Sequence, residues 1–336
     1  MMDIIRPNQE TIAFAYIYNL EPSDDILDVD FNGYRILPIE IFKERYQTHI
    51  DNMARHNVAP FETNFPGVIC KYVLLVSSLY DKDGKQVDLE TENPYSIFWA
   101  FFNTVFYCRL YKSGNLQLGT FFISYKNLNK LVYRELINTD FSCFMLTIYY
   151  RDYIRNSKPY IVNKSDVQNI LRLTSKLDQK DLEEESNLSH AIWAFCKTYT
   201  TGDIFYKITG FITSLESLLA DDGKEGEISF KLRTRLVYLL HDESLANFIP
   251  MIYEIRSCIT HIGGFDKKFM KKFIKKHKIE NWMEFLFIQI DKLEEICRCV
   301  IRYYFEQFSE RDKFDVEQMR NELNNEIFTT LAKRDK

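Results

Sequence analysis

The stretch FYKITGFITSLESLLADDGKEGEISFKLRTRLVYLL, Phe205 to Leu240, decides the fold of the C-terminal half of this 336-residue chain. Its first part places apolar residues at helical intervals, and its second part repeats that spacing after the polar turn DDGKEGE. Ser229 can cap the second helix at its start. The stretch therefore predicts two helices that are joined by a short turn and pack antiparallel to each other.

Helical spacing continues on both sides of this hairpin. A capping box formed by Ser165 and Gln168 predicts the start of an earlier helix, and Pro250 suits the first turn of a later one. Further apolar stripes predict helices over residues 188–199, 282–305 and 314–331. We therefore expect residues 165–336 to form an all-α bundle of antiparallel helices.

The N-terminal half, residues 1–160, has a different pattern. Short runs rich in β-branched and aromatic residues predict strands, and residues 106–125 predict a hairpin that turns at Lys112-Ser113-Gly114-Asn115. The other predicted strands are TIAFAYIY (11–18), YRILPIEIF (34–42) and GVICKYVLLVSSLY (67–80), with a helix over 40–57. We expect an α+β domain that senses a signal or binds a target or an unidentified regulator, followed by the all-α domain.

The composition limits the kinds of partner and site. A net charge of −5 excludes a generic polyanion binder, so any contact with nucleic acid must come from a local basic patch. Seven cysteines without a C-x-x-C pair predict free thiols in a reducing compartment, with no metal and no other cofactor.

The N-terminus lacks the apolar core of a signal peptide, and the most apolar run, Ser96 to Cys108, is too short to span a membrane. We expect a cytoplasmic protein that does not contact membranes.

The segment YEIRSCITHIGG, Tyr253 to Gly264, combines an arginine and a histidine with helical spacing. At about 100° per residue, one side of that helix carries Ile252, Ile255, Ile259 and Ile262. Arg256 and His261 lie about 140° apart and border a polar face that also carries Tyr253, Ser257 and Thr260. Arginine fits phosphate oxygens and histidine moves protons near neutral pH, so this face suits an anion.

The R-x4-H spacing alone arises easily by chance, and Arg235 with His241 forms a rival pair in the previous helix. The surrounding helices discriminate between the two pairs. Residues 165–310 resemble the Apea-like branch of the HEPN superfamily, and three segments carry the resemblance: Leu215-Glu216-Ser217-Leu218-Leu219, the basic and leucine-rich helix from Lys231 to Leu240, and Tyr253, Arg256, Ser257 and His261. The resemblance identifies Arg256 and His261 as the motif pair.

The HEPN resemblance implies a helical domain that dimerises with its motif helices facing each other. It also implies a metal-independent endoribonuclease, of the kind found in bacterial toxins and antiphage defence effectors. His261 would then act as acid or base, and Arg256 would stabilise the charged phosphorane. Non-catalytic members exist as well, so a homodimerising module that binds RNA or nucleotide without cleaving it remains an alternative. A third hypothesis gives the N-terminal domain an activity of its own.

Further residues near the motif pair are candidates for the same site. Ser257 and Tyr253 would either orient the phosphate or only pack, and Glu216 would either position an arginine or be a half-exposed charge. The run KKFMKKFIKKHK predicts an amphipathic basic helix over 267–278. The alternatives are a solvated face or a membrane-surface helix. We expect the lysines of this helix to contact the RNA backbone: Lys267, Lys268, Lys271, Lys272, Lys275 and Lys276.

Overall fold

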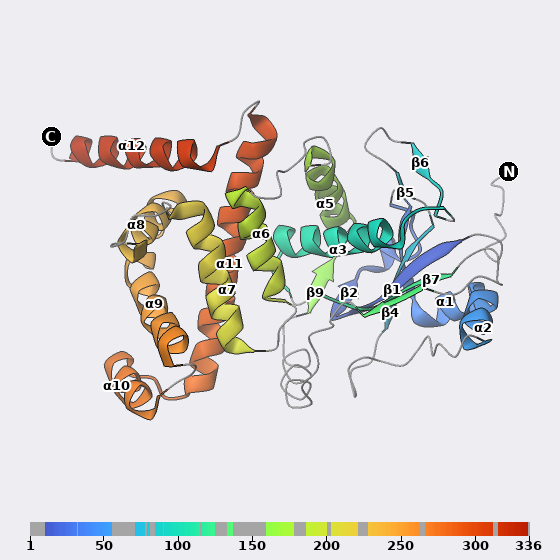
Figure 1. Cartoon of the computed structure of the whole chain (residues 1–336), viewed down its shortest axis with the longest axis horizontal. Coiled ribbons are helices and arrows are strands. Elements are labelled where there is room, and N and C mark those ends of the chain that lie inside the picture. The colour runs from blue at the N-terminus through green and yellow to red at the C-terminus, as the bar shows by residue number, and fades with distance from the viewer. Residues whose placement is uncertain are drawn as a thin grey trace. The chain divides into compact units, whose positions relative to one another are not determined.

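The computed structural model describes residues 11–31, 33–55, 71–77, 79–80, 85–89, 91–114, 116–124, 133–136, 159–177, 186–199, 203–220, 228–262, 266–311 and 315–334. The chain divides into two compact units, Met1–Gln179 and Lys180–Lys336. The first unit is built on an antiparallel sheet and the second is helical (Figure 1). The predicted order, an α+β part followed by a helical part, is therefore confirmed.

A five-stranded antiparallel sheet forms the centre of the first unit, with the strand order β3-β4-β1-β7-β8. The strands are β1 (Ile12–Tyr18), β3 (Tyr34–Pro38), β4 (Tyr72–Val76), β7 (Gln117–Ser124) and β8 (Tyr133–Leu136). Every residue of β1 is buried. Successive side chains of a strand point to opposite faces, and the odd and even residues of β1 join two different cores. The sheet is therefore covered on both sides.

In the described part of the chain, the helices that contribute to these covers include α1 (Ile39–Arg45), α2 (Gln47–Arg55) and α3 (Pro94–Tyr111). On one face α3 packs Phe101, and on the other face α1 packs Phe42. The predicted hairpin over 106–125 is wrong, because its first arm is the end of α3 and only its second arm is a strand, β7. The run that forms α3 is apolar on most sides, so it lacks the helical period that would distinguish it from a strand.

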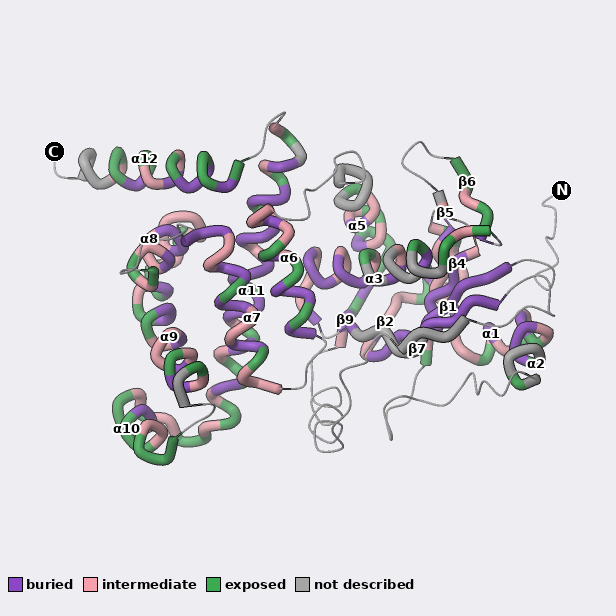
Figure 2. Tube along the Cα trace, viewed as in Figure 1, coloured by how far each residue is buried: buried purple, intermediate pink, exposed green. Residues whose placement is uncertain are grey.

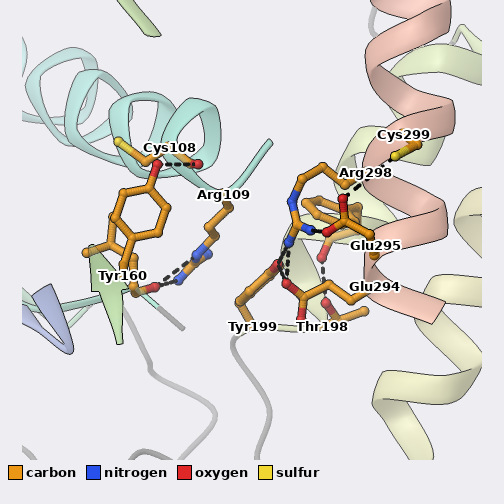
Figure 3. A network of polar contacts seen from close by, with 11 residues as sticks. Cys108, Arg109, Tyr160, Thr198, Tyr199, Glu294, Glu295, Arg298 and Cys299 are labelled. Atoms are coloured by element: carbon orange, nitrogen blue, oxygen red, sulfur yellow. Dashed lines mark hydrogen bonds and ion pairs between the residues drawn. The ribbon is translucent and has the colours of Figure 1, made fainter. Parts of the chain in front are cut away.

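Short elements complete the first unit. They are β2 (Leu20–Pro22), a 3-10 turn at Asp24–Ile26, β5 (Leu79–Tyr80), β6 (Gln86–Val87), β9 (Tyr160–Val162) and α5 (Lys164–Leu177). Strand β9 pairs in parallel with β2. The Tyr160 hydroxyl donates to the backbone carbonyl of Cys108 at 2.7 Å, which ties β9 to α3 (Figure 3).

Helix α5 begins two residues earlier than its predicted capping box. The Asp166 backbone N–H donates to Asn163 Oδ1, and the Asn163 backbone N–H donates to Asp166 Oδ2, each at 3.0 Å. This reciprocal pair caps the helix, whereas the predicted box used Ser165 and Gln168. Asn163 and Asp166 have the same three-residue spacing as the two residues of a capping box, so both pairs can be found in the sequence.

Helix α5 also belongs to the first unit rather than to the helical unit. Lys112 Nζ on the turn after α3 donates to Asp166 Oδ2 at 3.0 Å. Asn169 Nδ2 donates to the Tyr111 hydroxyl at 3.1 Å. These contacts join α5 to α3, and the boundary between the units lies after α5. The structure therefore divides the chain one helix later than the predicted domains, 1–160 and 165–336.

His49 on α2 is fully buried in the first unit. Its Nδ1 lies 2.7 Å from the Ser124 hydroxyl on β7. Burial removes the water that would solvate an imidazolium ion, and it lowers the pKa of His49 from 6.5 to about 4. The side chain is therefore neutral in the folded protein at neutral pH.

We expect His49→Asn to make the free energy of unfolding less dependent on pH below pH 6.5. Between pH 6.5 and about 4 the unfolded chain binds a proton at His49 that the folded chain does not. The stability contributed by the neutral ring is complete above pH 6.5 and falls by about 3 kcal/mol as the pH drops to 4. Asparagine keeps a polar atom near Ser124 but does not titrate. Urea unfolding of both proteins from pH 4 to 7 should show their stability difference narrowing as the pH falls; parallel profiles would refute this account.

The second unit consists of α6 (Asn187–Lys197), α7 (Ile204–Leu219), α8 (Ile228–Leu240), α9 (Leu245–Ile262), α10 (Lys267–His277), α11 (Trp282–Glu310) and α12 (Val316–Arg334). Each of these helices overlaps a predicted one. Pro250, however, lies inside α9 and not in its first turn. The turn before α9 explains the earlier start, because the Asp242 carboxylate accepts from the Ser244 backbone N–H at 2.9 Å and orders the chain there.

Helix α7 is central to this unit and packs against α6, α8, α9, α11 and α12. Its predicted apolar stripe is buried: Ile208, Phe211, Ile212, Leu215, Leu218 and Leu219. Gly210 permits the close approach of α6, because a Cβ atom at this position would lie 2.7 Å from Thr198 Cγ2. The bundle is therefore assembled around one helix, and that helix carries Glu216.

Candidate functional site

Helices α7 and α9 bring three of the predicted site residues together. Arg256 Nη1 donates to Glu216 Oε1 at 2.9 Å, and Arg256 Nη2 donates to Glu216 Oε2 at 3.0 Å. The Tyr253 hydroxyl donates to Glu216 Oε1 at 2.7 Å. Two parallel N–H···O bonds fix the plane of the guanidinium as well as its position. Of the two interpretations of Glu216, the one in which it pairs with an arginine is therefore confirmed.

The last turn of α7 holds Glu216 in place. The carbonyls of Ser217–Leu219 accept hydrogen bonds from Arg320 on α12, Arg235 on α8 and the Tyr304 hydroxyl on α11. These carbonyls have no partner inside the helix, and two guanidinium groups complement the negative end of its dipole. Glu216 thus stands on a turn that three other helices immobilise.

The polar face of α9 is present as predicted for the residues that the structure describes. Ile252 and Ile255 are fully buried, whereas Ser257 and Thr260 are exposed. Ser257 forms no hydrogen bond with the described residues, so the structure does not join it to the Glu216 pair. The backbone stays helical through Ile262, which places His261 in the last turn of α9. Its side chain lies outside the described residues.

Tyr253 acts as a hydrogen-bond donor in this cluster. Burial raises its pKa, and so does the negative charge of Glu216, which accepts its hydroxyl proton in a hydrogen bond. The phenol therefore stays protonated and cannot serve as a base near neutral pH. Its ring also lies 5.7 Å from the Arg256 guanidinium carbon, which adds a cation–π contact to the ion pair.

Arg256 remains partly accessible while it is held. Its side chain is 28% exposed, compared with 18% for Glu216. A guanidinium has five N–H donors, and Glu216 uses two of them. Arg256 Nε is buried and has no hydrogen-bond partner among the described residues, so the donors left for an anion are the second N–H groups of Nη1 and Nη2. The arrangement can therefore present an oriented cation to an anion on the exposed side of α9.

The rival pair, Arg235 and His241, does not form a site. Arg235 is 2% exposed, and its guanidinium donates to the Leu219 carbonyl and, at 3.0 Å, to Asn324 Oδ1. His241 lies exposed just past the end of α8, with a φ of 51°. An arginine buried among carbonyl oxygens cannot reach a ligand, so Arg235 is a structural residue.

The predicted basic helix is α10, and its six lysines are exposed. Lys276 Nζ donates to Glu254 Oε2 on α9 at 2.6 Å. Because Glu254 precedes Arg256 by two residues, this bond attaches the end of α10 to the helix that carries the motif. The structure thus places the lysine run next to α9.

One polar cluster was not predicted. Figure 3 shows the Arg298 guanidinium between Glu294, Glu295 and the Tyr199 hydroxyl, and Tyr199 also donates to Glu294 Oε1 at 2.7 Å. Arg298 is 1% exposed. The spacing of Glu294 and Arg298 is visible in the sequence, but the same spacing is common on solvated helix faces. Only the packing of α6 against α11 shows that the pair is buried and structural.

Neither the described structure nor comparisons with known proteins point to a metal site, a membrane span or a relative. Among the described residues, no group of three or more His, Cys, Asp or Glu side chains could hold a metal ion. None of the helices in the described parts is both long and apolar enough to cross a membrane. No family model matches the chain, and no curated protein or solved structure is detectably similar to it. The chemistry of the Glu216–Tyr253–Arg256 cluster must therefore indicate its function.

Proposed function

We propose that this chain is a metal-independent endoribonuclease with a HEPN-type helical unit. The observation that carries the proposal is the two-point ion pair of Glu216 and Arg256 on the polar face of α9. It leaves one N–H group on each Nη atom of an oriented guanidinium for phosphate oxygens, about 1.4 helical turns before His261. The order of the Glu216 turn, the basic helix α8 and the Arg256–His261 segment also supports the HEPN resemblance.

In this reaction the RNA supplies its own nucleophile. The 2′-oxygen forms a bond to the adjacent phosphorus while the bond from phosphorus to the 5′-oxygen breaks, which leaves a 2′,3′-cyclic phosphate and a 5′-hydroxyl. One group removes the proton of the 2′-hydroxyl and another delivers a proton to the 5′-oxygen. His261 performs one transfer, and His261 of a second copy performs the other in a symmetric dimer. Arg256 stabilises the negative charge of the phosphorane.

The surrounding residues have supporting roles in this proposal. Glu216 is a positioning residue, because it fixes the plane of Arg256 and touches no reacting atom. Tyr253 fixes Glu216 in turn, and Ser257 on the exposed face of α9 contacts the phosphate. The N-terminal unit senses a signal or binds a regulator, and the protein acts as a cytoplasmic toxin or antiphage effector.

One observation favours the alternative, a non-catalytic module that binds RNA or nucleotide and dimerises. Glu216 carries the opposite charge to Arg256 and lies in direct contact with it. The carboxylate therefore reduces the net positive charge that is available to a phosphorane, while oriented N–H donors still suit the binding of an intact phosphate.

Incubation of the purified protein with labelled RNA in excess EDTA distinguishes the two functions. We expect cleavage to continue in EDTA, because no step uses a metal, and the new ends to be 2′,3′-cyclic phosphates and 5′-hydroxyls. Those ends convert to 2′- or 3′-phosphates in mild acid, which identifies them. RNA that is bound but stays intact would favour the alternative, and products with 3′-hydroxyl ends would exclude the proposed chemistry.

A further inference from the structure

Helix α10 separates its charge and its apolar residues into two faces. Lysine pairs stand at 267/268, 271/272 and 275/276, and each pair follows the last after about 6 Å along the axis. At about 100° per residue the six lysines cover about half of the circumference. All six are exposed, and Figure 2 shows α10 as one of the more exposed helices of its unit. We call this half the lysine face.

The other half of α10 attaches the helix to its unit. Phe273 is 1% exposed, and its ring lies 5.7 Å from the ring of Trp282 and 6.2 Å from the ring of Phe285, both on α11. His277 stacks on Phe273 at 4.3 Å. Lys276 adds the bond to Glu254 on α9. The lysine face is therefore carried by an anchored helix and not by a free tail.

Five of the six charges of the lysine face have no counter-ion within the described parts of the chain. Apart from Lys276, its lysines form no hydrogen bond or ion pair there. The carboxylates that flank the helix in sequence, Asp266 and Glu280, do not pair with them either. The chain has a net charge of −5, so the residues outside the lysine face carry −11. Six unpaired or singly paired cations on one helix of an acidic protein favour an external polyanion.

We propose that the lysine face of α10 binds the phosphodiester backbone of a nucleic-acid strand and holds it beside α9 without reading its bases. Lysine is a point charge without the planar fork that recognises base edges, so its contacts fix position and not sequence. The Lys276–Glu254 bond places this surface next to the helix of Arg256. The choice of RNA as the bound strand rests on the proposed function; the binding of a phosphodiester chain does not.

The apolar half of α10 argues against a membrane surface as the partner. An interfacial helix buries its apolar face among lipid chains, so that face must be free. In this chain Phe273 is buried against α11, and the half-buried residues beside it face the same way: Phe269, Met270 and Ile274. Only the lysine face is open to a partner.

The test measures binding of a fluorescent single-stranded 2′-O-methyl RNA by anisotropy at several salt concentrations. This probe has no 2′-hydroxyl, so binding is separated from cleavage. The variant replaces four lysines by glutamine: Lys268, Lys271, Lys272 and Lys275. We expect its affinity to fall about 100-fold at 0.1 M salt, and the slope of log K against log salt to become shallower by about 3. Thermal unfolding checks that Phe273 still anchors the helix.

A matched variant removes the same charge from scattered exposed positions: Lys71, Lys85, Lys164 and Lys197, each to Gln. We expect it to bind like the wild type. Equal loss in both variants would show a net-charge effect, and no loss in the first variant would show that the lysine face is not the site; either result overturns the inference. A third result would also overturn it. In that result the wild type binds phosphatidylserine vesicles, and the first variant no longer binds the vesicles but still binds RNA with wild-type affinity. If the wild type binds RNA but does not cleave it, only the proposed ribonuclease function is defeated.

Discussion

His261→Asn is expected to slow the cleavage of RNA by about 10²–10⁴-fold. Asparagine approximates the size and polarity of histidine but cannot transfer a proton near neutral pH. In the proposed dimer both proton transfers depend on His261, one in each copy, so the substitution removes acid and base together. Single-turnover cleavage of labelled RNA in excess EDTA measures the loss.

His241→Asn is the matched control for this substitution. His241 lies exposed past the end of α8 with a φ of 51°, a backbone conformation that asparagine tolerates. The control variant should cleave RNA like the wild type, and both variants should unfold at the wild-type temperature. If His261→Asn cleaves as fast as His241→Asn, the motif has no catalytic role.

Arg298→Met is expected to lower the free energy of unfolding by about 3–5 kcal/mol. Arg298 is 1% exposed and Glu294 is 9% exposed, so the substitution leaves a buried carboxylate whose remaining partner is the Tyr199 hydroxyl. A buried charge that has lost its counter-ion keeps its full desolvation penalty. Chemical denaturation measures the loss, and the unfolding temperature should fall by about 10 °C.

Two further variants separate charge from packing at this position. Arg302→Met changes a half-buried arginine one turn along the same helix and should cost no more than about 1 kcal/mol. Arg298→Met combined with Glu294→Leu removes both charges and should recover most of the stability. A double variant as unstable as Arg298→Met would mean that lost packing, and not an unpaired carboxylate, causes the effect.

The helical unit shows how far a local pattern reaches. The apolar residues of α7 recur at helical spacing because one face of the helix must be buried. This pattern lies within sixteen consecutive residues, so the sequence alone predicts it. The division of α9 into an isoleucine side and a polar side follows in the same way. A helix that is apolar on most sides, such as α3, has no such contrast, and the hairpin prediction failed there.

The sequence by itself determined the order of the two units, the helices of the second unit, the polar face around Arg256 and the lysine spacing of α10. Only the tertiary structure decided which side chains meet. Glu216 and Arg256 are forty residues apart, and no periodicity connects them. Arg235 and Arg298 have the same chemistry as Arg256, yet packing buries them against carbonyls and carboxylates. The spacing of apolar residues predicts which side of each helix faces the core. The partner of a charged side chain depends instead on which helices pack side by side.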